Sequence, residues 1–293
     1  MSPKQPYNKT PLTFVQQIEH LQQRKMTFKN IPYAEKTLKQ TNYYRLSGYW
    51  HYFKKENSEE FQEDITFEHI LSLKQFDDNL RKHLLQGLQK IEISFKTIFA
   101  HYLSINCGNT HPHLDNTIFL DKDKYKQQYQ HLGKSIKRNE REEYIKHFAD
   151  KYEEEMPPIW ACVELMTFGE IIQWYDNLQL RYQKLISQQY NLGAKVLGSF
   201  MLNLSIARNK CTHYHRIWKK DTFTLAVKYE KIKNDHELKE HLLPSSKKPY
   251  NTIVLIDYFL RQQDIQHDWL QALNQLLKDF PCIDKYQDLG WKK

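Results

Sequence analysis

VLGSFMLNLSIARNKCTHYHRIW, residues 196–218, is the stretch that decides the expected fold. It contains no proline, and its apolar residues recur three and four positions apart, which predicts one helix over roughly 194–215. If the helix continues that far, one stripe holds Leu197, Met201, Leu204, Arg208, Cys211 and His215. Arg208 then stands where the pattern calls for another leucine. Because a buried guanidinium costs free energy unless it has a partner or a function, the stretch predicts a helical core with a polar site.

A second line on the same expected helix holds Ser205, Asn209 and His213 at four-residue spacing. His213 follows Arg208 by five residues, so the two side chains would point about 140° apart on an ideal helix. They could act on one phosphate only across the edge of a cleft, at a frayed helix end, or through a second copy of the chain.

The composition of the whole chain favours helices. Of its 293 residues only 8 are glycine and 27% are charged, and the long segments have a helical period of apolar residues. We therefore expect an all-α fold with at most minor strand content. One large domain or two small ones would fit this length. We expect a flexible arm over residues 1–11, followed by a single helical domain over 12–293.

Apolar spacing and helix-start signals place further helices along the chain. Thr13 and Pro32 are typical of the first turns of helices, which would end near residues 24 and 40. The longest periodic segment covers 66–104, and a C-terminal helical extension covers 250–280. Other expectations are a glycine turn at Gly48, a loop over 54–64, a bend at Gly87, a helix end at Phe168-Gly169, strand-like or irregular structure over 222–232, and a loose end over 290–293.

The net charge of +8 favours anionic partners, with nucleic acid first among them. No apolar run is long enough to span a bilayer and no signal-peptide pattern is present, so we expect a soluble, cytoplasmic protein without a membrane partner. The four cysteines are scattered without zinc-ligand spacing, and His111 and His113 have no third ligand nearby in the sequence. We expect no metal and no cofactor.

Two clusters are candidate RNA contacts. Tyr43, Tyr44 and Arg45 could stack on bases and bind phosphate, although aromatic side chains packed in a core explain them more simply. The second cluster consists of Lys134, Lys137, Arg138 and Arg141. A solvated helix face is the simpler explanation of these four residues, and contact with an RNA backbone is the second.

Two carboxylates, Asp77 and Glu92, interrupt the apolar faces of the segment 66–104. A carboxylate in such a position usually has a cationic partner. The candidates are Arg45, Arg81 and Arg208. We interpret both carboxylates as members of buried ion pairs that orient the core.

The run Arg208-Asn-x-x-x-His213 resembles the signature of HEPN ribonucleases, in which an arginine is followed a few residues later by a histidine. The longer run over 208–218 resembles the abortive-infection phage-resistance proteins of the AbiD/AbiF type. The resemblance extends over residues 12–220, with further blocks at 42–49, 77–81, 90–92 and 157–169. His213 takes the place of the expected catalytic histidine. The chain departs from the usual pattern at Thr212, Tyr214 and Lys219.

The resemblance implies an all-α, HEPN-like helical bundle that acts as a metal-independent endoribonuclease toxin in bacterial phage defence. His213 would be the general base or acid, Arg208 would stabilise charge on the phosphorane, and Asn209 would orient His213 or the phosphate. The products would carry 2′,3′-cyclic phosphate and 5′-hydroxyl ends. The implied partners are RNA, a second copy of the chain and an antitoxin made of RNA or protein, and no DNA is expected.

Alternatives remain at this site. His215 also stands at a permitted spacing from Arg208 and is a second candidate for the catalytic histidine. With Arg216 and Lys219 it is also a candidate for RNA binding. A histidine at a helix C-terminus is favoured by the helix dipole without any catalysis. Two other functions fit the sequence, namely a non-catalytic RNA-binding protein that grips phosphate with Arg208 and His213, and a helical scaffold with a structural polar motif.

Overall fold

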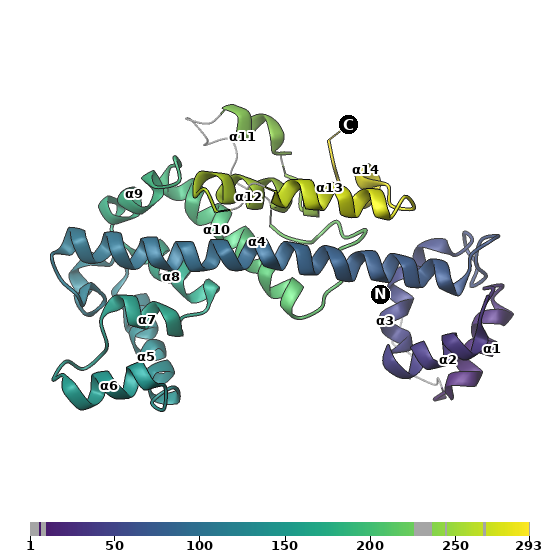
Figure 1. Cartoon of the computed structure of the whole chain (residues 1–293), viewed down its shortest axis with the longest axis horizontal. Helices are drawn as coiled ribbons and strands as arrows, with labels where there is room; N and C mark the ends of the chain where they lie inside the picture. The colour runs from purple at the N-terminus through teal and green to yellow at the C-terminus, as the bar shows by residue number, and fades with distance from the viewer. Residues whose placement is uncertain (1–5, 7–9, 226–235, 244, 266–267, 293) are drawn as a thin grey trace. The chain divides into compact units, whose positions relative to one another are not determined.

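The computed structural model describes residue 6 and residues 10–225, 236–243, 245–265 and 268–292 (Figure 1). In this part of the chain, fourteen α-helices and three short 3-10 helices form the fold, and no strand is present. Three isolated β-bridges are the only strand-like pairings among these residues. The expectation of an all-α fold with at most minor strand content is therefore confirmed.

The chain divides into two compact units. The first contains residues 1–79 and 280–283, and the second contains residues 80–279 and 284–293. The long helix α4, Phe67–Cys107, contributes its first residues to one unit and the remainder to the other. Because α4 belongs to both units, the expectation of one domain over 12–293 stays a prediction.

The first unit contains three short helices before α4, and each begins at a capping residue. Thr13 forms a capping box with Gln16, as its position predicted, and Asn30 and Asn42 cap the next two helices. The expected turn at Gly48 is wrong, because this residue lies inside the third helix. The three helices are α1 (Phe14–Gln23), α2 (Ile31–Gln40) and α3 (Tyr43–Trp50).

Asp77 is fully buried in the first unit and accepts a hydrogen bond from the Tyr49 hydroxyl at 2.7 Å. The tyrosine belongs to α3 and the aspartate to α4, so this bond joins two elements of the unit. The sequence predicted a cationic partner for this carboxylate and did not predict the phenol, which satisfies one of its oxygens. The loop over 54–64 is present as expected, closed by a bridge between Lys54 and Phe61.

The second unit is built around α10, which packs against α8, α9 and α12. The expected C-terminal helical extension over 250–280 is present and consists of two helices, α12 and α13. The helices that follow α4 are α5 (Lys122–Arg138), α6 (Glu143–Lys151), α7 (Ile159–Leu165), α8 (Phe168–Asn177), α9 (Leu180–Gln188), α10 (Ala194–Thr212), α11 (His236–His241), α12 (Pro249–Gln262), α13 (Trp269–Asp279) and α14 (Lys285–Asp288).

Gly87 does not interrupt α4, whose 41 residues form one helix roughly 60 Å long. A Cβ atom at this position would lie 2.5 Å from Cγ2 of Ile256 and 3.0 Å from Nε1 of Trp269. The glycine therefore allows α12 and α13 to approach α4 closely, and both lie along it in Figure 1. The same tryptophan donates its indole N–H to the His83 carbonyl at 3.2 Å.

Two other expectations about element ends are wrong. Phe168 and Gly169 begin α8 instead of ending α7, because Thr167 and Glu170 form a capping box. The start of the segment expected to be loose is packed, since Gly290 is buried and the Trp291 ring lies 5.2 Å from the Tyr250 ring, and residue 293 of that expectation lies outside the described part. Residues 222–225 form no strand, and residues 226–232 of that expectation lie outside the described part.

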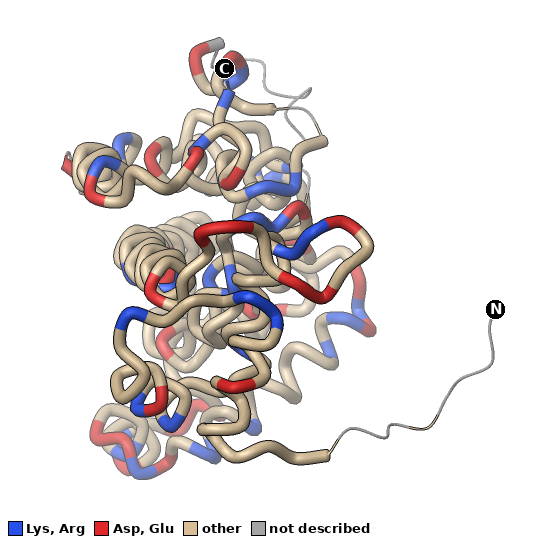
Figure 2. The backbone as a smooth tube through the Cα atoms, turned by 90° about the vertical axis from the view of Figure 1, so that its right-hand side faces the viewer, with Lys and Arg blue, Asp and Glu red and all other residues tan. Residues whose placement is uncertain are grey.

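No helix among the described residues is both long and apolar enough to cross a membrane. In the same residues, no group of three or more His, Cys, Asp or Glu side chains could hold a metal ion. Lysine and arginine alternate with aspartate and glutamate along the backbone of both units (Figure 2). The net charge of +8 is therefore spread along the chain and is not gathered in one element.

Candidate active site

Arg208 lies in the last turns of α10, directly after the apolar stripe that the sequence predicted. The stripe residues Leu197, Met201 and Leu204 are fully buried. Arg208 Nε donates to Oε2 of Glu92 at 3.2 Å, which confirms the predicted cationic partner of this carboxylate and shows which of the three candidate arginines it is. The Glu92 side chain is 11% exposed and the Arg208 side chain is 34% exposed, so the guanidinium is anchored in the interior and still reaches solvent.

Lys96 adds a second cation to this carboxylate, with Nζ 3.6 Å from Oε1 of Glu92. Lys96 itself is only 8% exposed. Two cations thus share one anion in a largely buried network that carries an excess of one positive charge, which favours an anionic ligand. Sequence reasoning missed Lys96. The signal that could have found it is the four-residue spacing from Glu92, at which opposite charges face each other on a helix.

Of the three predicted catalytic residues, Arg208, Asn209 and His213, the last two are exposed. Arg208 Nη1 donates to Oδ1 of Asn209 at 3.4 Å, so the amide and the guanidinium are in contact. His213 is the C-cap residue of α10, and its N–H donates to the Asn209 carbonyl at 3.0 Å. The structure therefore brings all three residues to the same end of one helix.

The end of α10 corrects the predicted helix over 194–215. The helix ends at Thr212, and Tyr214 has a left-handed backbone with φ of 58°. The His215 N–H donates to the Lys210 carbonyl at 2.9 Å, and the Tyr214 N–H donates to the Cys211 carbonyl at 3.1 Å. These two bonds form a Schellman motif, which reverses the chain at once. His215 therefore does not continue the Arg208 stripe.

Arg81 fixes the turn that follows. It is 4% exposed, and its Nη1 donates to the His215 carbonyl at 3.3 Å. Arg81 and Glu92 are eleven residues apart on α4, about three helical turns, so they lie on one face of that helix. One face of α4 thus holds both the Arg208 side chain and the backbone just beyond α10.

The residues after this turn are tied to the C-terminal segment. Nε1 of Trp218 donates to Oδ2 of Asp288 at 3.0 Å, and Nζ of Lys219 lies 3.6 Å from the other oxygen of the same carboxylate. Asp288 is 5% exposed. Arg216 is partly exposed. A role of His215, Arg216 and Lys219 in RNA binding stays a prediction, and the ion pair with Asp288 gives Lys219 a structural role as well.

Lys210 is a further basic residue of this region that sequence reasoning did not single out. Its Nζ donates to the Thr222 carbonyl at 2.7 Å. Burial lowers the pKa of this amine, and the nearby charge of Lys220 adds to the decrease. The structural contact explains its position without a role in chemistry.

The three other candidates near the N-terminus lie in the first unit, and the structure assigns them different environments. Tyr43 is half-buried and packs edge-on against Trp50 with ring centroids 4.9 Å apart. Burial raises the pKa of its phenol. Tyr44 is 85% exposed, and Arg45 is exposed as well. Tyr43 therefore fits the packing explanation, whereas Tyr44 presents an open ring to solvent.

The second basic cluster occupies the end of α5. Lys134, Lys137 and Arg138 are exposed there, and Arg141 is exposed just beyond the helix. Their spacing of three and four residues places the first three on one face. This arrangement fits the solvated helix face, and contact with an RNA backbone stays a prediction.

The histidines of residues 111–113 do not form a metal centre with other described residues. His113 is fully buried, and its Nε2 lies 3.6 Å from Sγ of Cys162. Burial, assisted by His111, lowers the pKa of His113 to about 3. Burial also raises the pKa of Cys162 to about 12. Both groups are thus neutral near pH 7, which makes a reactive thiolate at this place unfavourable.

The Abi-like protein family model matches residues 36–219, which is more than half of the chain. The chain belongs to the Abi-like protein family. The matched residues contain the whole of α4, with Glu92 and Lys96, and the whole of α10, with Arg208. Membership of the Abi-like family associates the chain with abortive-infection phage defence. No curated protein and no solved structure matches it.

Proposed function

We propose that this Abi-like protein is a HEPN-type endoribonuclease toxin of abortive-infection phage defence. The observation that carries the proposal is the anchored arginine at the end of α10. Arg208 is held by the buried Glu92 and stays one-third exposed, and Asn209 and His213 are exposed at the same helix end. A general base or acid beside a cation that is fixed in place is what transfer of an RNA phosphate requires.

The reaction proposed is attack of a ribose 2′-hydroxyl on the adjacent phosphorus. His213 takes the proton from this hydroxyl, or gives a proton to the 5′-oxygen that leaves. The P–O5′ bond breaks as the new P–O2′ bond forms, which gives a 2′,3′-cyclic phosphate and a 5′-hydroxyl. The nucleophile belongs to the RNA itself, so the step needs no metal-bound water. Arg208 stabilises the charge that develops on the phosphorane oxygens, as a guanidinium does well.

Glu92 and Lys96 position the arginine. The bond from Arg208 Nε to Glu92 fixes the plane of the guanidinium and directs its other edge away from the carboxylate. Lys96 compensates part of the Glu92 charge, so the pair does not cancel the positive charge of Arg208. Fixing a donor before the reaction removes the cost of ordering it in the transition state.

A homodimer is part of the proposal, and the outer stripe of α10 supports it. This stripe consists of Lys195, Ser199, Leu202, Ile206, Asn209 and His213. The intervals of four and three residues are those of helices that pack along each other. Leu202 is 41% exposed and Ile206 is partly exposed in a helix whose other faces are mostly buried. A second α10 packed on this stripe and running parallel to the first would bring two sets of Asn209 and His213 together.

The test in cells is growth arrest. Expression of the wild-type chain without its antitoxin should stop growth, and the antitoxin itself we expect to be RNA or protein. His213→Ala and Arg208→Ala should each restore growth at equal protein levels. His215→Ala is the matched control, because it changes an exposed histidine two residues away and should leave the protein toxic. Rescue by the control alone would move the catalytic role to His215.

A non-catalytic RNA-binding protein is the second candidate, favoured by the net charge of +8 and the 85% exposed ring of Tyr44. In this case Arg208 and His213 grip phosphate and cleave nothing. RNA binding should then weaken steeply with salt, by roughly fiftyfold between 50 and 200 mM if about four phosphates are neutralised. Salt-dependent binding together with intact RNA after long incubation would favour this function over the nuclease.

A further inference from the structure

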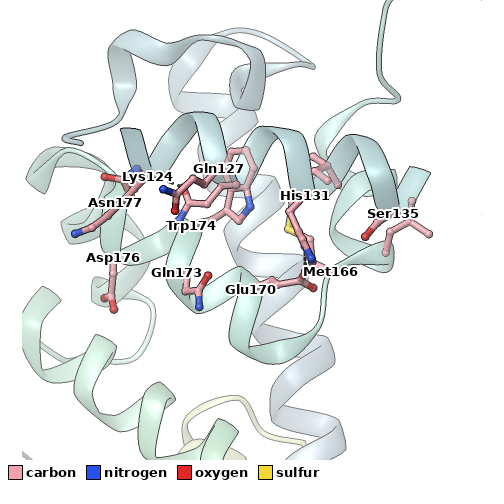
Figure 3. Close-up of a pocket in the computed structure, with 13 residues that line it drawn as sticks. Lys124, Gln127, His131, Ser135, Met166, Glu170, Gln173, Trp174, Asp176 and Asn177 are labelled. Carbon is pink, nitrogen blue, oxygen red and sulfur yellow. Dashed lines mark hydrogen bonds and ion pairs between the residues drawn. The ribbon is translucent and has the colours of Figure 1, made fainter. Parts of the chain in front are cut away.

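A cavity of about 700 Å³ lies in the second unit, between α5 on one side and α7 and α8 on the other (Figure 3). None of the residues assigned to the proposed cleavage lines it. This volume lies within the usual range for small-molecule sites in proteins. The cavity is therefore large enough for a ligand of the size of a nucleoside.

The base of the cavity is apolar. Leu132, Met166 and Trp174 contribute to it, and each of them is no more than 4% exposed. The Trp174 indole is held edge-on against Phe119, with ring centroids 5.3 Å apart. Such a floor is preformed and favours a flat, largely apolar ring over a sugar or a flexible chain.

The polar groups around this floor are mostly amides and a hydroxyl. Gln127 and Gln173 are exposed residues that line the cavity, and their side chains make no hydrogen bond to any other described residue. Gln128 uses its oxygen to accept from Asn177 at 3.3 Å, which leaves its own NH₂ group for a ligand. The hydroxyl of Ser135, a residue that is 8% exposed, also lines the cavity and has no partner among the described side chains. These groups can both donate and accept hydrogen bonds.

The charged groups at the cavity carry no excess of positive charge. Nδ1 of His131 contacts Oε1 of Glu170, and the other oxygen of Glu170 accepts from the Thr167 N–H at 2.6 Å as part of the helix cap. Lys124 pairs with Asp121 at 3.5 Å, and Asp176 adds a negative charge to the lining. A cavity without an excess of positive charge does not suit a phosphate-rich ligand. It suits a neutral molecule with donors and acceptors on its edge.

From these features we infer that the cavity is a binding site for a nucleobase. An apolar floor covers one face of the ring, and glutamine amides match the paired donor and acceptor groups on a base edge, as they do where proteins recognise adenine. The base can come from a free nucleoside or from a single-stranded RNA, because both present the same edge.

The test uses full-length Arg208→Ala protein, which keeps the cavity and lacks the arginine of the proposed cleavage. Adenosine, guanosine, cytidine and uridine are titrated separately by isothermal titration calorimetry, with ribose 5-phosphate as the anionic probe. At least one nucleoside should bind with saturation, and ribose 5-phosphate should not. Gln127→Leu and Gln173→Leu should each weaken binding by about tenfold, the loss expected for one good amide contact.

Gln130→Leu is the matched control, because it makes the same change at an exposed glutamine of α5 that does not line the cavity. It should bind like the parent protein. The inference is overturned if no nucleoside binds to the folded protein, if only ribose 5-phosphate binds, or if the control weakens binding as much as the cavity variants. These results do not depend on cleavage.

A competition arm separates the two sources of the base. A labelled single-stranded RNA that is displaced by the nucleoside, and that binds less well to Gln127→Leu, identifies the site as one for a base within RNA. An RNA that binds without competition, alongside a nucleoside that still requires Gln127 and Gln173, identifies a site for a free nucleoside. Both outcomes support the inferred site, and the first also connects it to an RNA substrate.

Discussion

At the scale of single residues, the Arg208 site depends on how buried charges are paired. Glu92 is the anion between two cations, Arg208 and Lys96. Removing it leaves two like charges close together with reduced access to water. Removing Lys96 instead leaves the contact between Glu92 and Arg208 in place. The two changes therefore have very different consequences, although they affect the same network.

Glu92→Gln should lower the free energy of unfolding by roughly 2–4 kcal/mol, below the full cost of breaking a buried pair because Arg208 is partly exposed. Lys96→Met, which keeps an apolar chain of similar length, should stay within about 1 kcal/mol of wild type. Urea unfolding measures both. An equal decrease in the free energy of unfolding for the two variants would contradict the role of Glu92 as the anion shared by Arg208 and Lys96.

His113 gives a pH dependence with a definite sign. Its pKa is about 3 in the folded protein and near 6.5 in the unfolded chain, so between these values only the unfolded chain binds the proton. The free energy of unfolding therefore falls as the pH decreases below about 6.5, by up to about 1.4 kcal/mol per pH unit from this residue, and above that pH it contributes no slope. In His113→Leu the slope between pH 6 and 4 should be smaller by about this amount. Parallel curves for both proteins would contradict the buried neutral imidazole.

At the scale of elements, the C-terminus of α10 determines where the candidate residues lie. The Schellman motif needs a left-handed residue after the cap, which is usually glycine, and this chain has Tyr214 there. A left-handed backbone costs a residue with a Cβ atom about 1 kcal/mol or more. Tyr214 is 67% exposed, so most of this residue lies in solvent.

Tyr214→Gly should therefore be more stable than Tyr214→Ala by about 1 kcal/mol, because both lose the ring and only glycine relieves the strain. Thermal unfolding of the two variants provides the comparison. An alanine variant that is as stable as the glycine variant would show that the left-handed turn is not present at this position.

The outer stripe of α10 makes a second prediction at this scale. Leu202→Glu should convert a dimer into a monomer, because it places a carboxylate where two apolar residues are expected to pack. Leu180→Glu is the matched control, since it makes the same change at a 49% exposed leucine of α9. Light scattering at micromolar concentration measures the molar mass of both variants and of the wild-type protein. A wild-type chain that is already monomeric and still cleaves RNA would rule out the dimer.

The elements differ in how well the sequence predicted them. Helix starts were predictable at Thr13 and Pro32, where the signal is local and chemical. The end of α10 was not, because a tyrosine occupies the position where glycine would have marked the turn. The pairing of Glu92 with Arg208 followed from misplaced polar residues in two apolar patterns. The bond from Arg81 to the His215 carbonyl could not be predicted, since it joins a side chain to a backbone group 134 residues away.

At the scale of the whole molecule, the net charge and the arrangement of the helices differ in how well they locate a functional site. The basic excess is spread among acidic residues, so the net charge alone marks no single RNA-binding surface. The concentration of polar groups at the end of α10 does mark one site. We therefore propose a chemical function for this site, in which Arg208 and His213 cleave RNA by attack of its 2′-hydroxyl.

The most direct measurement is the chemistry of the ends that the purified protein leaves on RNA in the presence of EDTA. Mass spectrometry should find 2′,3′-cyclic phosphates and 5′-hydroxyls with the wild-type protein and with His215→Ala. His213→Ala and Arg208→Ala should remain folded and give no fragments. Products with 5′-phosphates, a requirement for magnesium, or full cleavage by a folded His213→Ala protein would contradict the proposed function.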